Sequence, residues 1–315
     1  MSRIGRTEAL LALATGVLLA SSPLLPSWAV FLVTVALAKA LVVLGLLLLM
    51  RAGLVSFGQG LYFAAGAYAA GVASQMLRLA DAAAMVALAA LASCAIAAVL
   101  GILLAAYRGI FFAMLSLAFS MILYGLLVKT SSLGSTDGFN VAITTVAGVR
   151  LPGASARGGI FALTVVLAFL SAVGAHRFIG SDLGRLGPAV RDNELRVEYL
   201  GASVRRVVYL NYLLAAAVSG IGGALAGLAV GHIDPEMAYW TTSGEFVFVA
   251  ILSGAGSVAA PFAGAIAFEV LRSFAYEHSP NTWQMVVGLA MLLVILFLPS
   301  GLWSLFSRWR WQRAR

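Results

Sequence analysis

The chain has 315 residues, of which 62% are hydrophobic and only 10% are charged, and its mean hydropathy is +1.01. Soluble proteins carry about 25% charged residues, so this composition excludes a soluble globular protein and indicates an integral membrane protein. The formal net charge is +8, but the basic residues stand at the ends of apolar runs, where they act as topology signals. No basic stripe is interleaved with aromatic residues, so we expect no nucleic-acid partner.

Ten apolar runs are predicted to form transmembrane helices, because a bilayer span needs roughly 20 apolar residues. In chain order they cover about 9–25, 28–50, 54–77, 82–106, 109–128, 159–176, 207–231, 243–258, 260–277 and 283–299. We therefore expect an all-α integral membrane protein with about ten transmembrane helices, folded as a single domain over 1–315.

Two of these runs leave alternatives open. The first follows a basic N-terminus as a signal peptide would, but no small-x-small cleavage site follows it, so we interpret it as a retained span. The stretch 243–277 forms either two short helices broken near Pro261 or one long tilted helix. Pro and Gly are tolerated inside membrane helices where neighbouring protein satisfies the freed backbone groups.

The longest polar break on the Arg-rich side is 177–206. Its basic residues are Arg177, Arg185, Arg191, Arg196, Arg205 and Arg206. Most Lys and Arg residues lie on one side if both termini, the basic C-terminal segment included, are placed with this break in the cytoplasm. The break is either a docking helix for a cytoplasmic partner or a solvated connector. On the opposite side, 129–158 and 232–240 are either docking surfaces for a soluble delivery protein or ordinary loops.

Three stretches are unusually rich in small residues, and they are 53–68, 135–140 and 254–265. Small residues permit either close helix packing or a broken or re-entrant helix beside a polar cavity. In the first stretch, Ser56 and Gln59 would offer hydrogen bonds to a small polar solute. In the second, Asp137 precedes Gly138 in a turn signal and serves either the solute or the loop.

Isolated polar residues give few further signals. Cys94 lies inside an apolar run and is expected to be an inert thiol, and the three His residues show no metal-ligand spacing. We expect no metal, no cofactor and no catalytic residue. Lys39 lies midway along the second run, where a charge is costly in lipid and should face protein or water. It either attracts a substrate carboxylate or pairs with Glu269 or Glu245, and pairing is favoured.

Four motifs in chain order resemble one family, the membrane subunits of branched-chain amino-acid ABC importers of the Liv type. The first motif, GxxSxGxxxxFxxGAY, is matched by Gly53, Ser56, Gly58, Phe63, Gly66, Ala67 and Tyr68. The second is matched by Thr136, Asp137, Gly138 and Phe139. The third is matched by Ala189, Arg191, Asp192, Asn193, Glu194, Leu200 and Gly201. The fourth is matched by Gly254, Gly256, Ser257, Pro261, Gly264 and Ala265.

This resemblance implies a permease subunit in the bacterial inner membrane, with a homologous second permease, two ATP-binding cassette subunits and an extracytoplasmic solute-binding protein as partners. It implies that a cytoplasmic helix from Arg191 to Gly201, within the coupling loop 177–206, docks on the ATPase. The residues expected to couple to the ATPase are Arg191, Asp192, Asn193, Glu194, Leu200 and Gly201. The residues expected along the substrate pathway are Ser56, Gly58, Gln59, Gly66, Tyr68, Thr136 and Asp137.

Two other classes of function remain as alternatives. A self-sufficient ion-coupled carrier would use acidic residues within spans, and only Glu269 and Glu245 qualify. A membrane-embedded enzyme would need a cluster of His, Asp or Glu or an activated nucleophile, and none is visible. No GxxxxGK[ST] phosphate loop is present, so ATP hydrolysis is expected on another chain. The solute is a branched-chain amino acid by default, with urea, amides and aromatic acids left open.

Overall fold

The computed structural model describes residues 5–141, 145–150, 154–298 and 301–304, and the basic C-terminal residues Arg308 to Arg315 lie outside this part. The α-helices are α1 (Arg6–Ser21), α2 (Ser27–Arg51), α3 (Gln59–Gln75), α4 (Ala82–Leu104), α5 (Gly109–Lys129), α6 (Ala154–Gly180), α7 (Asp182–Asp192), α8 (Glu194–Tyr199), α9 (Val204–Val230), α10 (Trp240–Ser253), α11 (Ala260–His278) and α12 (Trp283–Phe297). The remaining elements are β1 (Phe139–Asn140), β2 (Thr145–Val146), β3 (Val149–Arg150) and β4 (His232–Ile233), and three 3₁₀ turns at Ser131–Leu133, Ser135–Asp137 and Pro235–Ala238.

The expected helical membrane architecture is confirmed. Every one of the ten apolar runs contains a helix. Within the described residues, five helices are long and apolar enough to cross a bilayer, and they are α2, α4, α5, α6 and α9. The apolar parts of α1 and α12 are shorter. The chain is therefore a multi-pass membrane protein.

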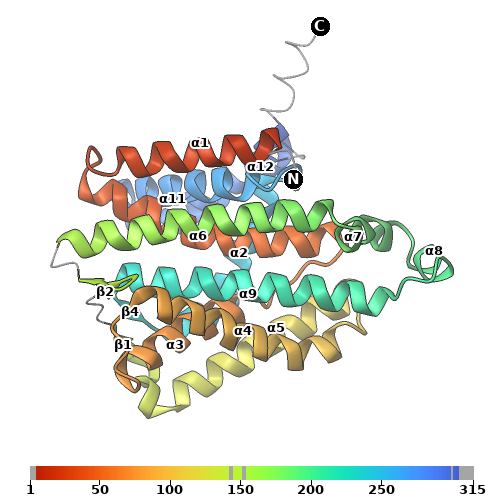
Figure 1. Cartoon of the computed structure of the whole chain (residues 1–315), viewed down its shortest axis with the longest axis horizontal. Coiled ribbons are helices and arrows are strands. Elements are labelled where there is room, and N and C mark those ends of the chain that lie inside the picture. Colours follow the sequence, from red (N-terminus) through yellow and green to blue (C-terminus); the bar gives the residue numbers. More distant parts are fainter. Residues whose placement is uncertain (1–4, 142–144, 151–153, 299–300, 305–315) are drawn as a thin grey trace, which may run out of the picture.

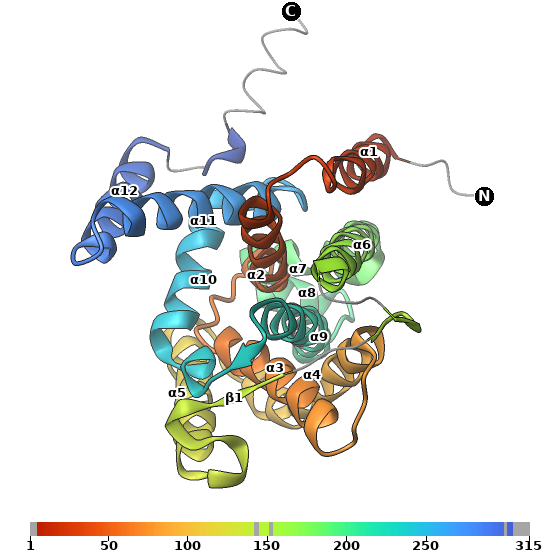
Figure 2. The ribbon, with the colours of Figure 1, turned by 90° about the vertical axis from the view of Figure 1, so that its left-hand side faces the viewer.

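Helix α9 forms the centre of the molecule, and α2, α3 and α4 pack directly on it (Figure 2). Small residues permit this close packing, as in other membrane helix pairs. A Cβ added at Gly45 of α2 would lie 2.7 Å from the carbonyl oxygen of Ala215 in α9. A Cβ at Gly66 of α3 would overlap the backbone of Gly220 in α9. Three glycines of α9 face the same neighbours, because an added Cβ would meet Ser93 of α4 at Gly220, Ala38 of α2 at Gly222 and Phe63 of α3 at Gly223.

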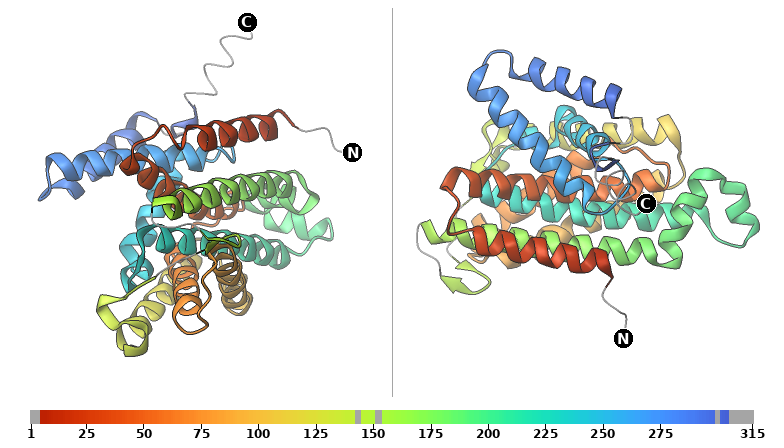
Figure 3. Two further views of the ribbon diagram at one scale, coloured as in Figure 1. Left: turned by 60° about the vertical axis from the view of Figure 1, so that its left-hand side comes forward. Right: turned by 90° about the horizontal axis from the view of Figure 1, so that it is seen from above.

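The two ends of the helical bundle differ in structure (Figures 1 and 3). At one end, α7 and α8 project beyond the C-terminal end of α2, and we call this the α7–α8 end. At the other, the strand end, β1 pairs antiparallel with β4, and β2 with β3. Helices α2 and α9 run in opposite directions between these ends (Figure 1).

Two segments interrupt the helices inside the apolar runs. Residues 52–58, between α2 and α3, are not helical, and α3 begins only at Gln59. Residues 254–259 separate α10 from α11, so the stretch 243–277 forms two helices and the alternative of one long tilted helix is wrong. Gly254 has φ +79°, which disfavours any other residue type. Pro261 then occupies the first turn of α11, where its missing N–H is tolerated.

Candidate functional site

The polar segment predicted as the coupling loop is largely helical. Helix α6 continues through Arg177 to Gly180, so the loop begins later than expected. Ser181 then starts α7, and its side chain accepts a hydrogen bond from the Gly184 amide at 3.2 Å. The predicted single helix from Arg191 to Gly201 is wrong, because Asn193 is extended (φ −164°, ψ 104°).

Asn193 separates two helices instead. Arg191 and Asp192 end α7, while Asn193 caps α8 by accepting a hydrogen bond from the Arg196 amide at 3.0 Å. Asn side chains favour a cap position over a helix interior because they bond to nearby backbone amides, and this preference explains the break at Asn193. The residues from 191 to 201 therefore form a helix end, a cap and a separate short helix.

The C-terminal end of α8 is a Schellman motif that requires Gly201. The Gly201 amide donates to the carbonyl of Glu198 at 2.9 Å, and the Ala202 amide donates to the carbonyl of Val197 at 3.2 Å. Gly201 has φ +83°, a conformation that a side chain disfavours. Val197 is 2% exposed and fastens α8 to the helices beneath it.

Three apolar side chains of α8 and its C-terminal cap are exposed. They are Leu195, Tyr199 and Leu200, with 66%, 90% and 79% of their surface accessible. We call them the α8 patch. A patch of this kind at a polar end of the molecule is typical of a protein contact.

Charged contacts connect this region to other segments of the chain. Arg108, in the turn between α4 and α5, donates from Nε to the Glu194 carboxylate at 2.6 Å. Arg191 lies 3.7 Å from Asp192, and its side-chain stem packs over Gly53, where an added Cβ would lie 2.7 Å from Arg191 Cγ. The α7–α8 segment thus contacts both the α4–α5 turn and the start of the non-helical segment 52–58.

That non-helical segment leads to a buried polar group. Ser56 and Gln59 are both fully buried. Ser56 Oγ accepts a hydrogen bond from the Gly58 amide at 3.2 Å, and Gln59 Oε1 accepts one from Ser219 Oγ of α9 at 2.7 Å. The Gln59 Nε2 amide is buried and has no hydrogen-bond partner among the described residues. A buried donor left unpaired is costly, and a passing solute that accepts a hydrogen bond would pair with it.

The other predicted pathway residues lie apart from this group. Gly58 packs on the Ser116 backbone of α5, and Gly66 packs on α9. Tyr68 lies further along α3 towards the strand end, and its ring contacts Phe139 edge to face at a centroid distance of 5.6 Å. The structure brings Ser56, Gly58 and Gln59 together, and it places Gly66 and Tyr68 along the same helix.

Thr136 and Asp137 are exposed in a 3₁₀ turn at the strand end. The Thr136 hydroxyl donates to Asp137 at 3.2 Å. Next to them, the chain from Phe139 pairs with β4. These two residues therefore lie at the strand end, and among the described residues they make no hydrogen bond to Ser56 or Gln59.

At the strand end, the Asp81 side chain, which precedes α4, joins two segments of the chain. Its carboxylate accepts hydrogen bonds from the Gly148 amide at 2.5 Å and from the amides of Ala83 and Ala84 at 3.0 and 3.1 Å. The bond from Gly148 is the main reason that the pKa of Asp81 lies below its ordinary value. Asp81 thus connects the β2–β3 hairpin to the start of α4.

A charged cluster lies within the helices. Lys39 Nζ of α2 is 2.6 Å from Glu245 of α10 and 2.6 Å from Glu269 of α11, so the favoured pairing role of Lys39 is confirmed. Arg272 of α11 lies 3.5 Å from Glu245 and 3.7 Å from Glu269. The sequence analysis did not single out Arg272 or predict this contact. Its position three residues after Glu269 in one helical run is the signal for it.

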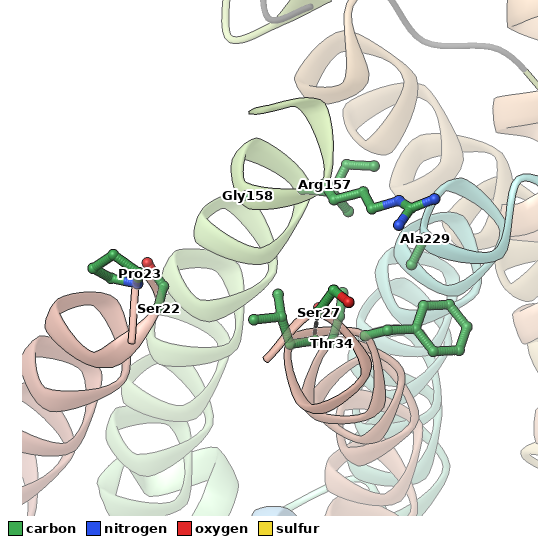
Figure 4. A pocket seen from close by; sticks show the side chains of 10 residues that line it. Ser22, Pro23, Ser27, Thr34, Arg157, Gly158 and Ala229 are labelled. Atoms are coloured by element: carbon green, nitrogen blue, oxygen red, sulfur yellow. Dashed lines mark hydrogen bonds between the residues drawn. The ribbon is translucent and has the colours of Figure 1, made fainter. Parts of the chain in front are cut away.

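A cavity of about 290 Å³ opens near the strand end, between the α1–α2 turn, α6 and α9 (Figure 4). Its polar lining includes Ser22, Ser27 and Thr34, and the guanidinium of Arg157 extends over it towards Ala229. The Thr34 hydroxyl already donates to the carbonyl of Val30 at 2.6 Å. No predicted site residue lines this cavity.

The match to known proteins agrees with these features. The family model described as "Branched-chain amino acid transport system / permease component" matches residues 28–296, and the chain belongs to this family. The chain is 25% identical over 272 residues to the high-affinity branched-chain amino acid transport system permease protein LivM of Escherichia coli (strain K12). The match covers 79% of this chain and 64% of LivM, so the chain spans just under two thirds of that relative.

A second relative is the permease protein LivH of the same kind of system in Salmonella typhimurium, which is 26% identical over 171 residues. That match covers 54% of this chain and 51% of LivH. No solved structure matches the chain.

Proposed function

We propose that the chain is the permease subunit of an ATP-driven ABC importer that moves a small amino acid or related solute into a bacterial cell. The observation that carries this proposal is the family match over residues 28–296. The proposed partners are a homologous second permease, two ATP-binding cassette subunits and an extracytoplasmic solute-binding protein. The proposed location is the inner membrane, with the α7–α8 end in the cytoplasm. The chain itself hydrolyses nothing, and its partners supply ATP hydrolysis.

The α7–α8 segment is the proposed contact with the ATPase. The α8 patch is exposed and apolar, as a docking element must be before its partner binds. Arg191, Asp192, Asn193, Glu194, Leu200 and Gly201 are proposed to couple ATPase closure to the membrane helices, with Asn193 and Gly201 fixing both ends of α8.

Movement of α8 has two routes into the membrane. One passes through the Arg108–Glu194 ion pair to the turn between α4 and α5. The other passes through Arg191 to Gly53, at the start of the non-helical segment that leads to Ser56 and Gln59. Both routes are chains of direct contacts, so a rigid displacement of α7–α8 would shift the segment 52–58.

The pathway is proposed to follow α3. Thr136 and Asp137 lie at the entrance, Tyr68 lies further inside, and the buried amide of Gln59 and hydroxyl of Ser56 form the polar step. Gly58 and Gly66 hold α3 against α5 and α9. We propose that 52–75 is one span with a broken first half, one of about ten spans in the chain. Broken spans with polar backbone at mid-membrane are a recurring feature of transporters.

The ion-coupled carrier is disfavoured by the charged cluster. Such a carrier would need a carboxylate free to take up an ion within the spans. Glu245 and Glu269 both bind Lys39 at 2.6 Å, so neither carboxylate is free in this way. ATP-independent uptake driven by a proton gradient would favour the carrier instead.

Co-purification from the native membrane tests the proposed assembly. We expect the wild-type chain to carry a second permease and two ATPase subunits. Leu200→Glu should remove the ATPases and leave the second permease bound, because Leu200 is 79% exposed and its replacement does not disturb the core. Leu77→Glu, at 61% exposure on the far side of the membrane, is the matched control and should retain the ATPases. Equal recovery from both variants would contradict docking at α8.

A further inference from the structure

The charged cluster holds two positive and two negative side chains at one place between α2, α10 and α11. Lys39 bonds both carboxylates at 2.6 Å, whereas Arg272 lies 3.5 Å from Glu245 and 3.7 Å from Glu269. The side chains of Lys39, Glu245 and Glu269 are 15%, 22% and 12% exposed, and that of Arg272 is 36% exposed. Lys39 is thus committed to its partners, while Arg272 is held loosely at the edge.

A cavity of about 450 Å³ lies directly beside this cluster. Glu269 and Arg272 form its charged wall, and Trp28, Phe31 and Trp283 contribute to its apolar walls. Arg272 also stacks over the Trp283 ring, with its guanidinium carbon 5.4 Å from the ring centroid. The cavity extends along the first part of α2, from the strand end of the molecule towards Lys39 at the middle of that helix.

The charges of the cluster restrict what this cavity accepts. The four side chains sum to zero, so a solute with a single net charge would leave that charge uncompensated in a membrane interior. A zwitterion adds no net charge and has one partner for each end. The guanidinium of Arg272 offers donors in the fork geometry that suits a carboxylate, and only long contacts occupy them. The Glu269 carboxylate in the same wall would accept from an ammonium group.

We propose that this cavity is a binding site for a zwitterionic amino acid with an apolar side chain. Arg272 binds the α-carboxylate, Glu269 binds the α-ammonium, and the aromatic wall receives the side chain. Lys39 is a positioning residue that holds both carboxylates in place through its two 2.6 Å contacts. The proposal rests on the proposed importer function and adds to it a site within this chain, separate from any specificity of the solute-binding protein.

A purely structural cluster makes different predictions. If the four charges only fasten α10 and α11 to α2, conservative changes at Arg272 and Glu269 would alter stability and leave solute selection unchanged. If they bind the solute, the same changes would lower its affinity in a complex that still assembles. The two readings are separated by a direct binding measurement.

The experiment uses the complex purified from the native membrane, placed in lipid nanodiscs, with radiolabelled L-leucine as the probe. The variants are Arg272→Gln, Arg272→Lys and Glu269→Gln, and Arg157→Gln, which lines the separate cavity of Figure 4, is the matched control. Arg272→Gln and Glu269→Gln should weaken L-leucine binding by about tenfold or more, since each loses a charge-assisted hydrogen bond. Arg272→Lys should bind more weakly than wild type but more tightly than Arg272→Gln, and Arg157→Gln should bind as wild type.

Competition with L-leucine analogues tests whether the site recognises both the α-carboxylate and the α-ammonium group. L-leucinamide lacks the carboxylate and 4-methylpentanoate lacks the amine, so neither should displace L-leucine at tenfold excess. Three results would overturn the site. They are wild-type affinity in both Arg272→Gln and Glu269→Gln, no saturable L-leucine binding by the wild type, and competition by either analogue equal to that of L-leucine. If Arg272→Gln does not assemble, the L-leucine affinity of Arg272→Lys tests the site instead, because lysine retains the positive charge and lacks the forked guanidinium donors.

ATPase recovery and ATP hydrolysis in the same samples keep the two proposals apart. A complex that retains its ATPases and hydrolyses ATP, yet binds urea in preference to L-leucine, refutes the zwitterion site and leaves the importer standing. A chain that purifies without ATPases refutes the importer whatever it binds.

Discussion

The Arg108–Glu194 ion pair offers a sharp test of how α8 is held. The Nε–Oε1 distance is 2.6 Å, and the two side chains are 29% and 41% exposed. A pair this accessible to water contributes about 1 kcal/mol. Glu194→Arg removes that attraction and places two guanidinium groups together, which adds a repulsion of about 1 kcal/mol in water. The total of about 2 kcal/mol is small for the whole protein and large for a six-residue helix that is unstable alone.

We therefore expect Glu194→Arg to insert and purify normally while α8 leaves its position on the α4–α5 turn. ATP-driven uptake into proteoliposomes should fall severely, since the route through Arg108 is lost. Glu194→Gln loses only the attraction and should show a smaller defect.

The charge-swapped double variant Arg108→Glu/Glu194→Arg is the decisive control. If Glu194 acts by pairing with Arg108, the swap restores an ion pair and should recover much of the uptake, with a coupling energy of about 1 kcal/mol or more in the double-mutant cycle. A double variant no better than Glu194→Arg alone would refute this reasoning and assign Glu194 to a contact on the ATPase.

Three further predictions concern other parts of the chain. Gly66→Leu should prevent correct folding, since even a Cβ there would overlap the Gly220 backbone, whereas Gly174→Leu, which faces open space in α6, should yield normal protein by size-exclusion chromatography. Gly201→Val should reduce uptake and Gly201→Asn should largely preserve it, because Asn tolerates the positive φ of +83°. The lowered pKa of Asp81 means that its anchoring of the hairpin is complete above its unfolded pKa and is lost as the pH falls through the folded value. Asp81→Asn should therefore raise hydrogen exchange in 145–150 at neutral pH, and unchanged exchange would contradict the anchor.

Much of the fold was predictable because a bilayer imposes long apolar runs. Each run became a helix, and the break before Pro261 followed from a Gly-rich stretch and a proline, both of which can be read locally. The late start of α3 at Gln59 was not predictable in detail, since the residues 54–58 are as apolar as a helix interior would be. Gly53, with φ +76°, ends α2 just before them, and Gly58 packs on the Ser116 backbone of α5.

The candidate sites also divide into features that the sequence predicts and features that depend on distant contacts. The Lys39 pairing was accessible from sequence because a buried cation needs a carboxylate and the predicted spans hold few, Glu245 and Glu269 among them. The partners of Gln59 and Glu194 were not accessible, because Ser219 and Arg108 lie 160 and 86 residues away along the chain. The helix break at Asn193 was readable in principle, as Asn before Glu is a common helix start.

ATP-dependent uptake is the most direct test of the central claim that this chain forms the membrane pathway of an importer. The complex purified from the native membrane, with its solute-binding protein, would be reconstituted into proteoliposomes with ATP or a non-hydrolysable analogue enclosed. The proposed function predicts accumulation of the solute only with ATP, and its loss in Leu200→Glu. Accumulation that follows an imposed proton gradient and ignores ATP would contradict it.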